Sequence, residues 1–111
     1  FKVWGSGKPM RELIFVDDIA EACIFFMNKN TKESLINIGT GKDMRIRDYD
    51  SFLIKKLKLK VQIKYDNSKP DGVFRKVLDI KLAKKYGWKP SFSLEKGFQI
   101  TYKDFIKKYK K

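Results

Sequence analysis

Hydrophobic residues recur at helical spacing in three stretches of this chain, and polar residues mark where each predicted helix begins. Residues 17–29 start with two aspartates and close with a lysine, which complements the helix dipole at both ends. A second helix is predicted over residues 46–58, and Ser93 is placed to cap a third that follows it. The apolar positions are Ile19, Ala22, Cys23, Phe26 and Met27 in the first helix, Ile46, Tyr49, Leu53 and Leu57 in the second, and Leu94, Phe98, Tyr102, Phe105 and Tyr109 in the third.

Shorter apolar segments between these helices predict strands. Asp79 is suited to cap a further short helix that ends at Tyr86, and Gly87 is suited to stop it. Because strands alternate with helices, we expect an α/β fold. The predicted strands are residues 1–4, 12–16, 35–38 and 61–65, the last of which alternates apolar and polar side chains, and residues 66–72 have the composition of a loop.

The composition is that of a folded chain with a modest core. Its 111 residues favour one domain, 42% of them are hydrophobic, and no apolar run is long enough to span a bilayer. No stretch of the given residues has the pattern expected of a secretory signal. The chain opens with Phe1 inside a predicted strand rather than with a methionine, so we expect an amino-terminal part to be missing.

Cysteine and histidine usage excludes several kinds of site. With one cysteine and no histidine, the chain lacks the means for an internal disulfide, a Cys/His zinc site or a histidine general base. A single cysteine fits a reducing compartment. We expect Cys23 to be a buried small hydrophobe on its helical stripe, and Trp88, which follows Gly87, to pack over a helix end.

The positive charge is concentrated in the second half of the chain. The net charge is +13, yet residues 1–50 hold eight basic and eight acidic residues, whereas residues 51–111 hold 18 basic and five acidic. Such a surface either binds phosphate or keeps the protein solvated. The predominance of lysine on predicted helix faces favours the solvated surface.

Trp4 and Arg11 are the first candidates for ligand binding. A flat indole beside a forked guanidinium suits a ligand with a ring at one end and phosphate at the other. The alternatives are a core or turn tryptophan for Trp4 and an ion pair with Glu12, Asp17 or Asp18 for Arg11. Both interpretations remain open at the level of residue types.

The segment Lys69-Pro70-Asp71-Gly72-Val73-Phe74-Arg75-Lys76 supplies a second group of candidates. An Asp-Gly pair after proline is usually a turn. The Asp71 carboxylate could instead accept hydrogen bonds from a sugar or base, and Arg75 and Lys76 could reach a phosphate.

Three apparent cofactor or catalytic motifs lie in surroundings that do not suit the chemistry they suggest. Gly5-Ser6-Gly7 and Gly39-Thr40-Gly41 each follow a predicted strand but lack the third glycine, and the first leads into an extended stretch rather than the helix that a pyrophosphate site needs. We interpret them as turns whose glycines need positive φ. Tyr65-x-x-x-Lys69 matches a catalytic pattern of short-chain dehydrogenases, but its turn-forming residues and Pro70 argue against the required helix.

Five blocks of the sequence are informative in combination. They are Trp4-Gly5-Ser6-Gly7-x-Pro9-Met10-Arg11-Glu12, Val16-Asp17-Asp18-x-Ala20, Asn37-Ile38-Gly39-Thr40-Gly41, Ser68-Lys69-Pro70-Asp71-Gly72-x-x-Arg75-Lys76-x-Leu78-Asp79 and Gly87-Trp88. In this order and spacing the chain resembles the GDP-L-fucose synthases, which are extended short-chain dehydrogenases acting on nucleotide sugars. The resemblance covers nearly the whole chain and corresponds to roughly the last third of those enzymes.

The resemblance implies that residues 1–111 form the C-terminal, substrate-binding part of a Rossmann-type α/β enzyme whose cofactor domain is missing, with residues 17–41 packing on that domain. The family converts GDP-4-keto-6-deoxy-D-mannose to GDP-L-fucose by two epimerisations and a reduction with NADPH. Trp4, Arg11 and Asp71 match family positions that contact the GDP-sugar, and Arg75 and Lys76 are weaker candidates for the same pocket. NADP would be bound by the missing N-terminal domain.

The family's catalytic Ser, Tyr-x-x-x-Lys and Cys/His pair all fall in the missing part, so we expect this chain alone to be inactive. We also expect bare apolar faces, marginal stability and aggregation. The resemblance further implies a cytoplasmic enzyme that is a homodimer at full length, without nucleic-acid or membrane partners. Two departures stand out: Val73-Phe74 replaces a Thr-Pro pair, and Arg45 replaces a helix-capping Thr or Ser, for which Asp43 could substitute.

Two other functions stay open. The first is a different nucleotide-sugar epimerase, reductase or dehydratase, which a preference among GDP, UDP and dTDP would reveal. The second is a basic nucleic-acid-binding module, which would lose affinity steeply with added salt but has no recognised motif here.

Overall fold

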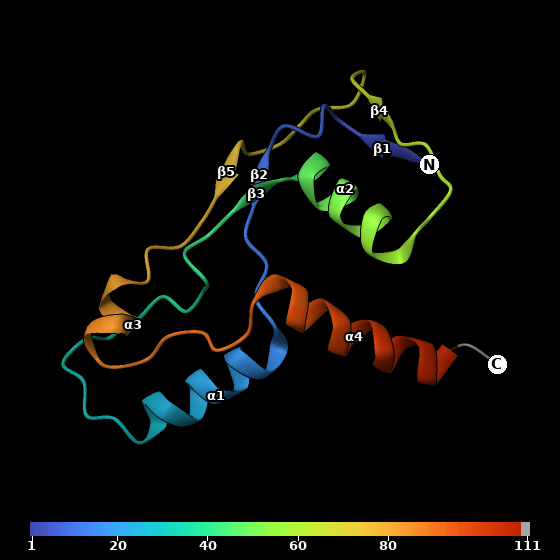
Figure 1. The fold of residues 1–111 in the computed structure, drawn as a ribbon. Helices are drawn as coiled ribbons and strands as arrows, with labels where there is room; N and C mark the ends of the chain where they lie inside the picture. Colours follow the sequence, from blue (N-terminus) through green and yellow to red (C-terminus); the bar gives the residue numbers. More distant parts are fainter. Residues whose placement is uncertain (110–111) are drawn as a thin grey trace. The chain divides into compact units, whose positions relative to one another are not determined.

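The computed structural model describes residues 1–109, and they form two compact units. The first unit contains residues 1–12 and 42–77, and the second contains residues 13–41 together with the described residues from 78 onward. Helices and short strands alternate along the chain (Figure 1), which confirms the predicted α/β class. No helix of residues 1–109 has the length and hydropathy needed to cross a membrane.

The first unit contains all the strands found in the described residues. β1 runs parallel to β4, so that Val3 is paired with Tyr65, and α2 lies near them in Figure 1. β2 lies between β3, which is antiparallel to it, and β5, which is parallel. The elements are β1 (Lys2–Trp4), β2 (Met10–Arg11), β3 (Met44–Arg45), α2 (Ile46–Leu57), β4 (Lys64–Asp66) and β5 (Arg75–Lys76).

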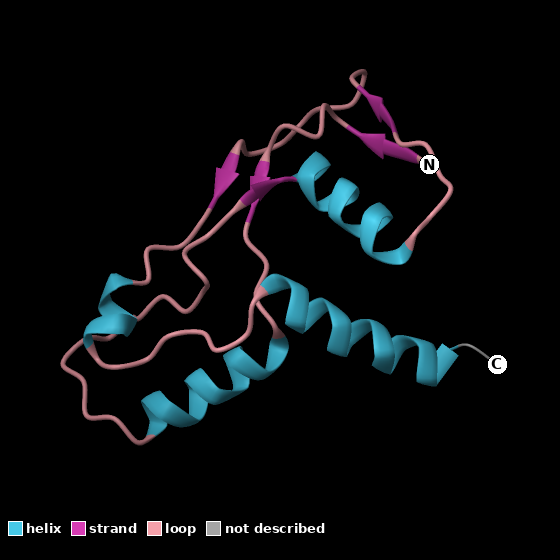
Figure 2. Cartoon of the chain, viewed as in Figure 1, coloured by secondary structure: helices cyan, strands magenta, loops and turns pink. Residues whose placement is uncertain are grey.

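The second unit is built from helices and connecting loops, as Figure 2 shows by colour. Its core is a cluster of Ala22, Ala83 and Trp88, each at most 1% exposed. The expected burial of Trp88 near the end of α3 is therefore confirmed. The helices are α1 (Val16–Met27), α3 (Lys81–Lys85) and α4 (Leu94–Tyr109).

Local signals in the sequence place the helix ends of the second unit correctly. The Ser93 hydroxyl accepts a hydrogen bond from the Lys96 backbone N–H at 3.2 Å and so caps α4. Asp79 accepts from the Lys81 N–H at 2.9 Å beside the start of α3. Gly87 takes a φ of 99° just beyond α3, where a side chain would be strained.

Asp18 ties the first turn of α1 to the segment before α4. Its carboxylate is 1% exposed and accepts hydrogen bonds from the backbone N–H groups of Ser91 at 2.8 Å and Phe92 at 3.1 Å. A buried carboxylate is tolerated only when its oxygens find such donors. Asp18 is therefore a structural residue of the second unit.

Several predictions about strands are wrong. Residues 12–16 are not a strand, because the strand is Met10–Arg11 and α1 already begins at Val16. Residues 35–38 form no strand, since the described part of the second unit offers no neighbouring strand to accept their backbone hydrogen bonds. The predicted strand 61–65 begins only at Lys64, where pairing with β1 starts.

The prediction that Cys23 is buried is also wrong. Cys23 is exposed, as are Ile24 at 60% and Met27 at 79%, because only the side of α1 that carries Ala22 is covered by the core cluster. Every lysine of residues 1–109 is exposed, which agrees with the interpretation of the basic residues as a solvated surface.

Candidate functional site

All five residues proposed from the sequence as ligand contacts belong to the first unit. Trp4 ends β1, and its side chain is 70% exposed, so the interpretation of Trp4 as a core tryptophan is wrong. The Lys69 ammonium lies 5.2 Å from the centre of the indole ring. An exposed indole with a cation at its face is suited to stack on a planar or sugar ring that carries phosphate.

The turn that follows Trp4 closes on the Asp71 carboxylate. The Ser6 backbone N–H donates to Asp71 Oδ1 at 2.6 Å, and the Ser6 hydroxyl donates to Oδ2 at 2.8 Å. These two hydrogen bonds are the main reason that the pKa of Asp71 lies below its usual range. The contacts fix Asp71 beside the turn that carries Trp4.

Glycine is required at two positions of this turn, which we call the 5–7 turn. Gly5 and Gly7 have φ values of 86° and 71°, as predicted for turn glycines. A Cβ on Gly5 would lie 2.5 Å from Asp71 Oδ1, and one on Gly7 would lie 2.4 Å from the Tyr65 ring. The two glycines let the backbone approach the carboxylate and the aromatic ring closely.

Arg11 lies on β2 and is held by backbone carbonyls. Its Nη1 donates to the carbonyl oxygens of Met10 at 2.7 Å and Val73 at 2.8 Å. The two carbonyls orient the guanidinium.

The strand register separates the basic residues of this unit into two sets. Residues paired directly across adjacent strands project to the same side, and successive residues alternate. Arg11 is paired with Lys76, and Met10 is paired with both Arg75 and Arg45. Arg11 and Lys76 therefore project from one side of the sheet, and Arg75 and Arg45 from the other.

Arg75 has a partner that the sequence did not suggest. Its guanidinium forms a two-pronged contact with Asp43, at 2.6 and 3.0 Å, and the Asp43 side chain is 5% exposed. The hydrogen bond from Arg75 is the main cause that lowers the pKa of Asp43. Asp43 is thus not a substitute cap for α2, and the ligand role of Arg75 stays a prediction.

The side chain of Arg45 also fails to cap α2. As the residue preceding that helix it makes no capping hydrogen bond, and instead contacts Asp48 through two hydrogen bonds of 2.8 and 2.9 Å. The replacement of a Thr or Ser by Arg45 therefore exchanges a backbone cap for an exposed ion pair.

Tyr65 is a structural residue. It lies on β4 rather than on a helix, which confirms that its spacing to Lys69 is not the catalytic pattern. Its hydroxyl donates to Asp50 Oδ2 at 2.8 Å. Burial, followed by that hydrogen bond, raises the pKa of Tyr65 to about 12, so the phenol stays protonated at neutral pH.

Arg47 is a residue of this unit that the sequence alone did not single out. It lies in the first turn of α2 and donates from Nη2 to the Ser6 carbonyl at 2.6 Å. A signal was available, because a basic residue in the first turn of a helix opposes the helix dipole and calls for another explanation.

Neither glycine turn of the described residues has the surroundings of a dinucleotide site. The 5–7 turn leads into β2, and the glycine turn ending at Gly41 leads into β3, so neither glycine turn opens directly into a helix. A pyrophosphate site of the Rossmann type needs the amino terminus of a helix at that point. Neither glycine turn therefore has the helix amino terminus for lack of which the sequence analysis rejected them as cofactor sites.

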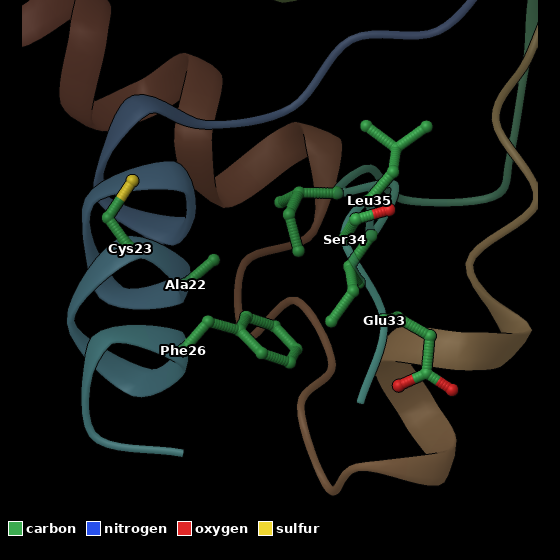
Figure 3. Close-up of a pocket in the computed structure, with 8 residues that line it drawn as sticks. Ala22, Cys23, Phe26, Glu33, Ser34 and Leu35 are labelled. Atoms are coloured by element: carbon green, nitrogen blue, oxygen red, sulfur yellow. The ribbon is translucent and has the colours of Figure 1, made fainter. Parts of the chain in front are cut away.

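The second unit contains a pocket of about 290 Å³. In Figure 3, Ala22 and Phe26 point from α1 toward the segment that carries Ser34 and Leu35, and Cys23 on the same helix also lines the pocket. The Tyr86 hydroxyl donates to the Glu33 carboxylate near this segment. The lining is largely apolar and brings no group of catalytic residues together.

Comparison with known proteins identifies relatives along almost the whole chain. Residues 1–39 match the model of the NAD dependent epimerase/dehydratase family. GDP-L-fucose synthase of Escherichia coli is 42% identical over 94% of this chain and 35% of its own length. GDP-L-fucose synthase 1 of Arabidopsis thaliana is 35% identical over 95% of this chain and 32% of its own.

Solved structures of nucleotide-sugar enzymes share the fold. The UDP-glucose 4-epimerase of Thermotoga maritima, solved with UDP-glucose, has a TM-score of 0.87 and 30% identity over 96% of this chain and 35% of its own. A GDP-6-OMe-4-keto-L-xylo-heptose reductase from Campylobacter jejuni has a TM-score of 0.82 and 26% identity over 96% of this chain and 34% of its own.

The chain spans about a third of the length of the curated relatives that it matches. Its structure matches part of the Rossmann-type fold of those enzymes, as the sequence predicted. The resemblance inferred from the sequence blocks is thus confirmed: this chain is similar to the GDP-L-fucose synthases along nearly all of its length and folds as part of an extended short-chain dehydrogenase.

Proposed function

We propose that this chain is the nucleotide-sugar-binding part of an NADP-dependent enzyme that makes GDP-L-fucose from GDP-4-keto-6-deoxy-D-mannose. One observation carries the proposal. The exposed Trp4 directly precedes the 5–7 turn, and this turn is hydrogen-bonded to the Asp71 carboxylate. Arg11 belongs to the same unit. The similarity to GDP-L-fucose synthases supports the choice of substrate.

Each of these side chains has a distinct part in binding. Trp4 offers a flat apolar face to the base or the sugar. Arg11 and Lys76, on the same side of the sheet, supply positive charge to the diphosphate. Asp71 accepts one hydrogen bond on each oxygen from Ser6, and a carboxylate has about four acceptor sites, so it can also accept from a sugar or base.

Binding of free nucleotides tests this proposal directly. GDP, UDP and dTDP are titrated into the chain by calorimetry, and we expect GDP to bind most tightly. Tighter binding of UDP or dTDP would favour a different nucleotide-sugar epimerase or dehydratase, since this chain also shares the fold of a UDP-glucose 4-epimerase. Absence of GDP binding would overturn the proposal.

Two arginines on opposite sides of the sheet provide a matched comparison. We expect Arg11→Ala to weaken GDP binding by about tenfold or more, as the loss of a charge-assisted contact of about 1.5–3 kcal/mol implies. Arg45→Ala removes an equal charge from the other side, where Asp48 already pairs with it, and should leave GDP affinity unchanged.

The proposal includes the absence of activity in this chain alone and the docking of residues 17–41 on the cofactor-binding part of the enzyme. Ile24, Met27 and Leu35 are 60%, 79% and 77% exposed, which is the bare apolar surface that such docking would cover. Turnover of the keto-sugar with NADPH by this chain would contradict the first point. The cytoplasmic location and the homodimer of the full enzyme stay part of the same proposal.

The exposed apolar surface has its own test. We expect the dye ANS to bind the chain, and Ile24→Lys with Leu35→Lys to abolish much of that binding. Fluorescence unchanged by the double substitution would place the apolar surface elsewhere.

A further inference from the structure

Arg47 ties α2 to the 5–7 turn at two successive carbonyls. Its backbone N–H donates to the Gly7 carbonyl at 3.0 Å, and its side-chain Nη2 donates to the Ser6 carbonyl at 2.6 Å. A hydrogen bond from a guanidinium is stronger than one between neutral groups. The turn is therefore fastened from the side of α2 as well as from the side of Asp71.

The guanidinium is itself held in place by an aromatic ring. The central carbon of the Arg47 guanidinium lies 4.8 Å from the centre of the Tyr65 ring. Tyr65 is anchored in turn by its hydrogen bond to Asp50, which lies on α2 near Arg47. Gly7 packs directly on the same ring, where a Cβ would come within 2.4 Å of it. Arg47, Tyr65 and Gly7 thus form one packed group.

Ser6 stands between this group and the residues proposed to bind the ligand. Its carbonyl is held by Arg47, and its N–H and hydroxyl are held by Asp71. Trp4 lies two residues before Ser6, at the end of β1. We propose that Arg47 is a positioning residue that fixes the 5–7 turn and so orients Trp4 and Asp71 toward the nucleotide sugar. This inference rests on the function proposed above.

The substitution Arg47→Lys tests the inference because it keeps the charge and removes the planar fork. A lysine cannot both lie flat on the Tyr65 ring and direct an N–H to Ser6 in the same geometry. The matched control is Arg45→Lys, two residues earlier, whose contact with Asp48 is exposed and does not involve the turn.

The experiment follows each tryptophan separately. The chain is labelled with 5-fluorotryptophan, and the two ¹⁹F lines are assigned with Trp4→Phe, since Trp88 is the other tryptophan and lies in the core of the second unit. In Arg47→Lys we expect the Trp4 line to shift or broaden, the Trp88 line to stay, and the Kd for GDP to rise about tenfold. Arg45→Lys should change none of these.

Three outcomes would overturn the inference: an unchanged Trp4 line, an unchanged affinity for GDP in a variant whose Trp4 line moves, or an equal effect of Arg45→Lys. If Arg47→Lys alters both tryptophan lines, the variant Tyr65→Leu decides, because it removes the ring beneath the guanidinium. In Tyr65→Leu, a change confined to the Trp4 line together with weaker GDP binding supports the inference. Any other result for Tyr65→Leu overturns it. If the unmodified chain does not bind GDP, the proposed function fails, and the Trp4 line alone then decides the role of Arg47.

Discussion

The two units of this chain bury different kinds of residue. The second unit buries apolar side chains, Ala22, Ala83 and Trp88, at its centre. The buried residues of the first unit are Gly5, Gly7 and Pro9, all in or next to the 5–7 turn. Apolar burial therefore stabilises the second unit, whereas backbone geometry and hydrogen bonds shape the first. Substitutions in the second unit should lower stability, and substitutions in the first should alter ligand binding.

The largest effect expected from this contrast concerns the two tryptophans. Trp88→Ala removes the largest buried side chain and should cost about 3–5 kcal/mol of unfolding free energy, as for buried aromatic residues in general. Trp4→Ala removes a side chain that is 70% exposed and should change stability little while weakening GDP binding. Denaturant unfolding and calorimetric titration of both variants measure the two effects. Similar stability losses in the two variants would break the contrast.

The second comparison uses two aspartates that each accept two hydrogen bonds. Asp18→Ala leaves two N–H groups in the second unit without their acceptor and should cost about 2–4 kcal/mol. Asp71→Ala releases exposed donors on Ser6, which water can satisfy, and should mainly weaken GDP binding. Urea unfolding of the two variants separates them, and a larger loss for Asp71→Ala would contradict the account.

Two glycines with nearly equal φ sharpen the account of the first unit. Gly7 and Gly72 have φ values of 71° and 74°, so alanine is strained at both by about 1–2 kcal/mol. A Cβ at Gly7 would meet the Tyr65 ring, whereas one at Gly72 meets nothing within 4 Å. Gly7→Ala should therefore cost about 1 kcal/mol more than Gly72→Ala in a thermal melt and disturb GDP binding more. Equal losses would show that packing on Tyr65 is unimportant.

The smallest effect concerns the pH dependence of stability. The folded pKa of Tyr65 is about 12, above the usual value near 10, so the folded state holds the phenolic proton more tightly than the unfolded state does. The stability from this proton is fully present below pH 10 and is lost as the pH rises to 12. The difference between the unmodified chain and Tyr65→Phe should shrink by about 1–2 kcal/mol over that interval. A constant difference would contradict the raised pKa.

The sequence predicted what depends on neighbouring residues and missed what depends on distant ones. The caps at Ser93 and Gly87 follow from local preferences and were predicted correctly. The strand expected at residues 35–38 and the burial expected for Cys23 both need a neighbour that the described residues do not provide. Patterns along one segment say that a surface is apolar, but not what covers it.

The candidate site shows the same limit. Residue types and family resemblance singled out Trp4, Arg11 and Asp71, and the structure shows that Trp4 is exposed and that Asp71 is fastened to the turn beside it. The contact of Arg47 with Ser6 spans 41 positions, and that of Arg75 with Asp43 spans 32. No local pattern encodes such pairs, because chain folding alone brings them together.

A titration of the ¹⁵N-labelled chain with GDP, followed residue by residue by NMR, tests the central claim most directly. The account predicts shift changes concentrated in residues 4–11 and 69–76 of the first unit, with the core cluster of the second unit unaffected. Shift changes that fall mainly on the second unit, or that follow the exposed lysines without regard to position, would contradict it.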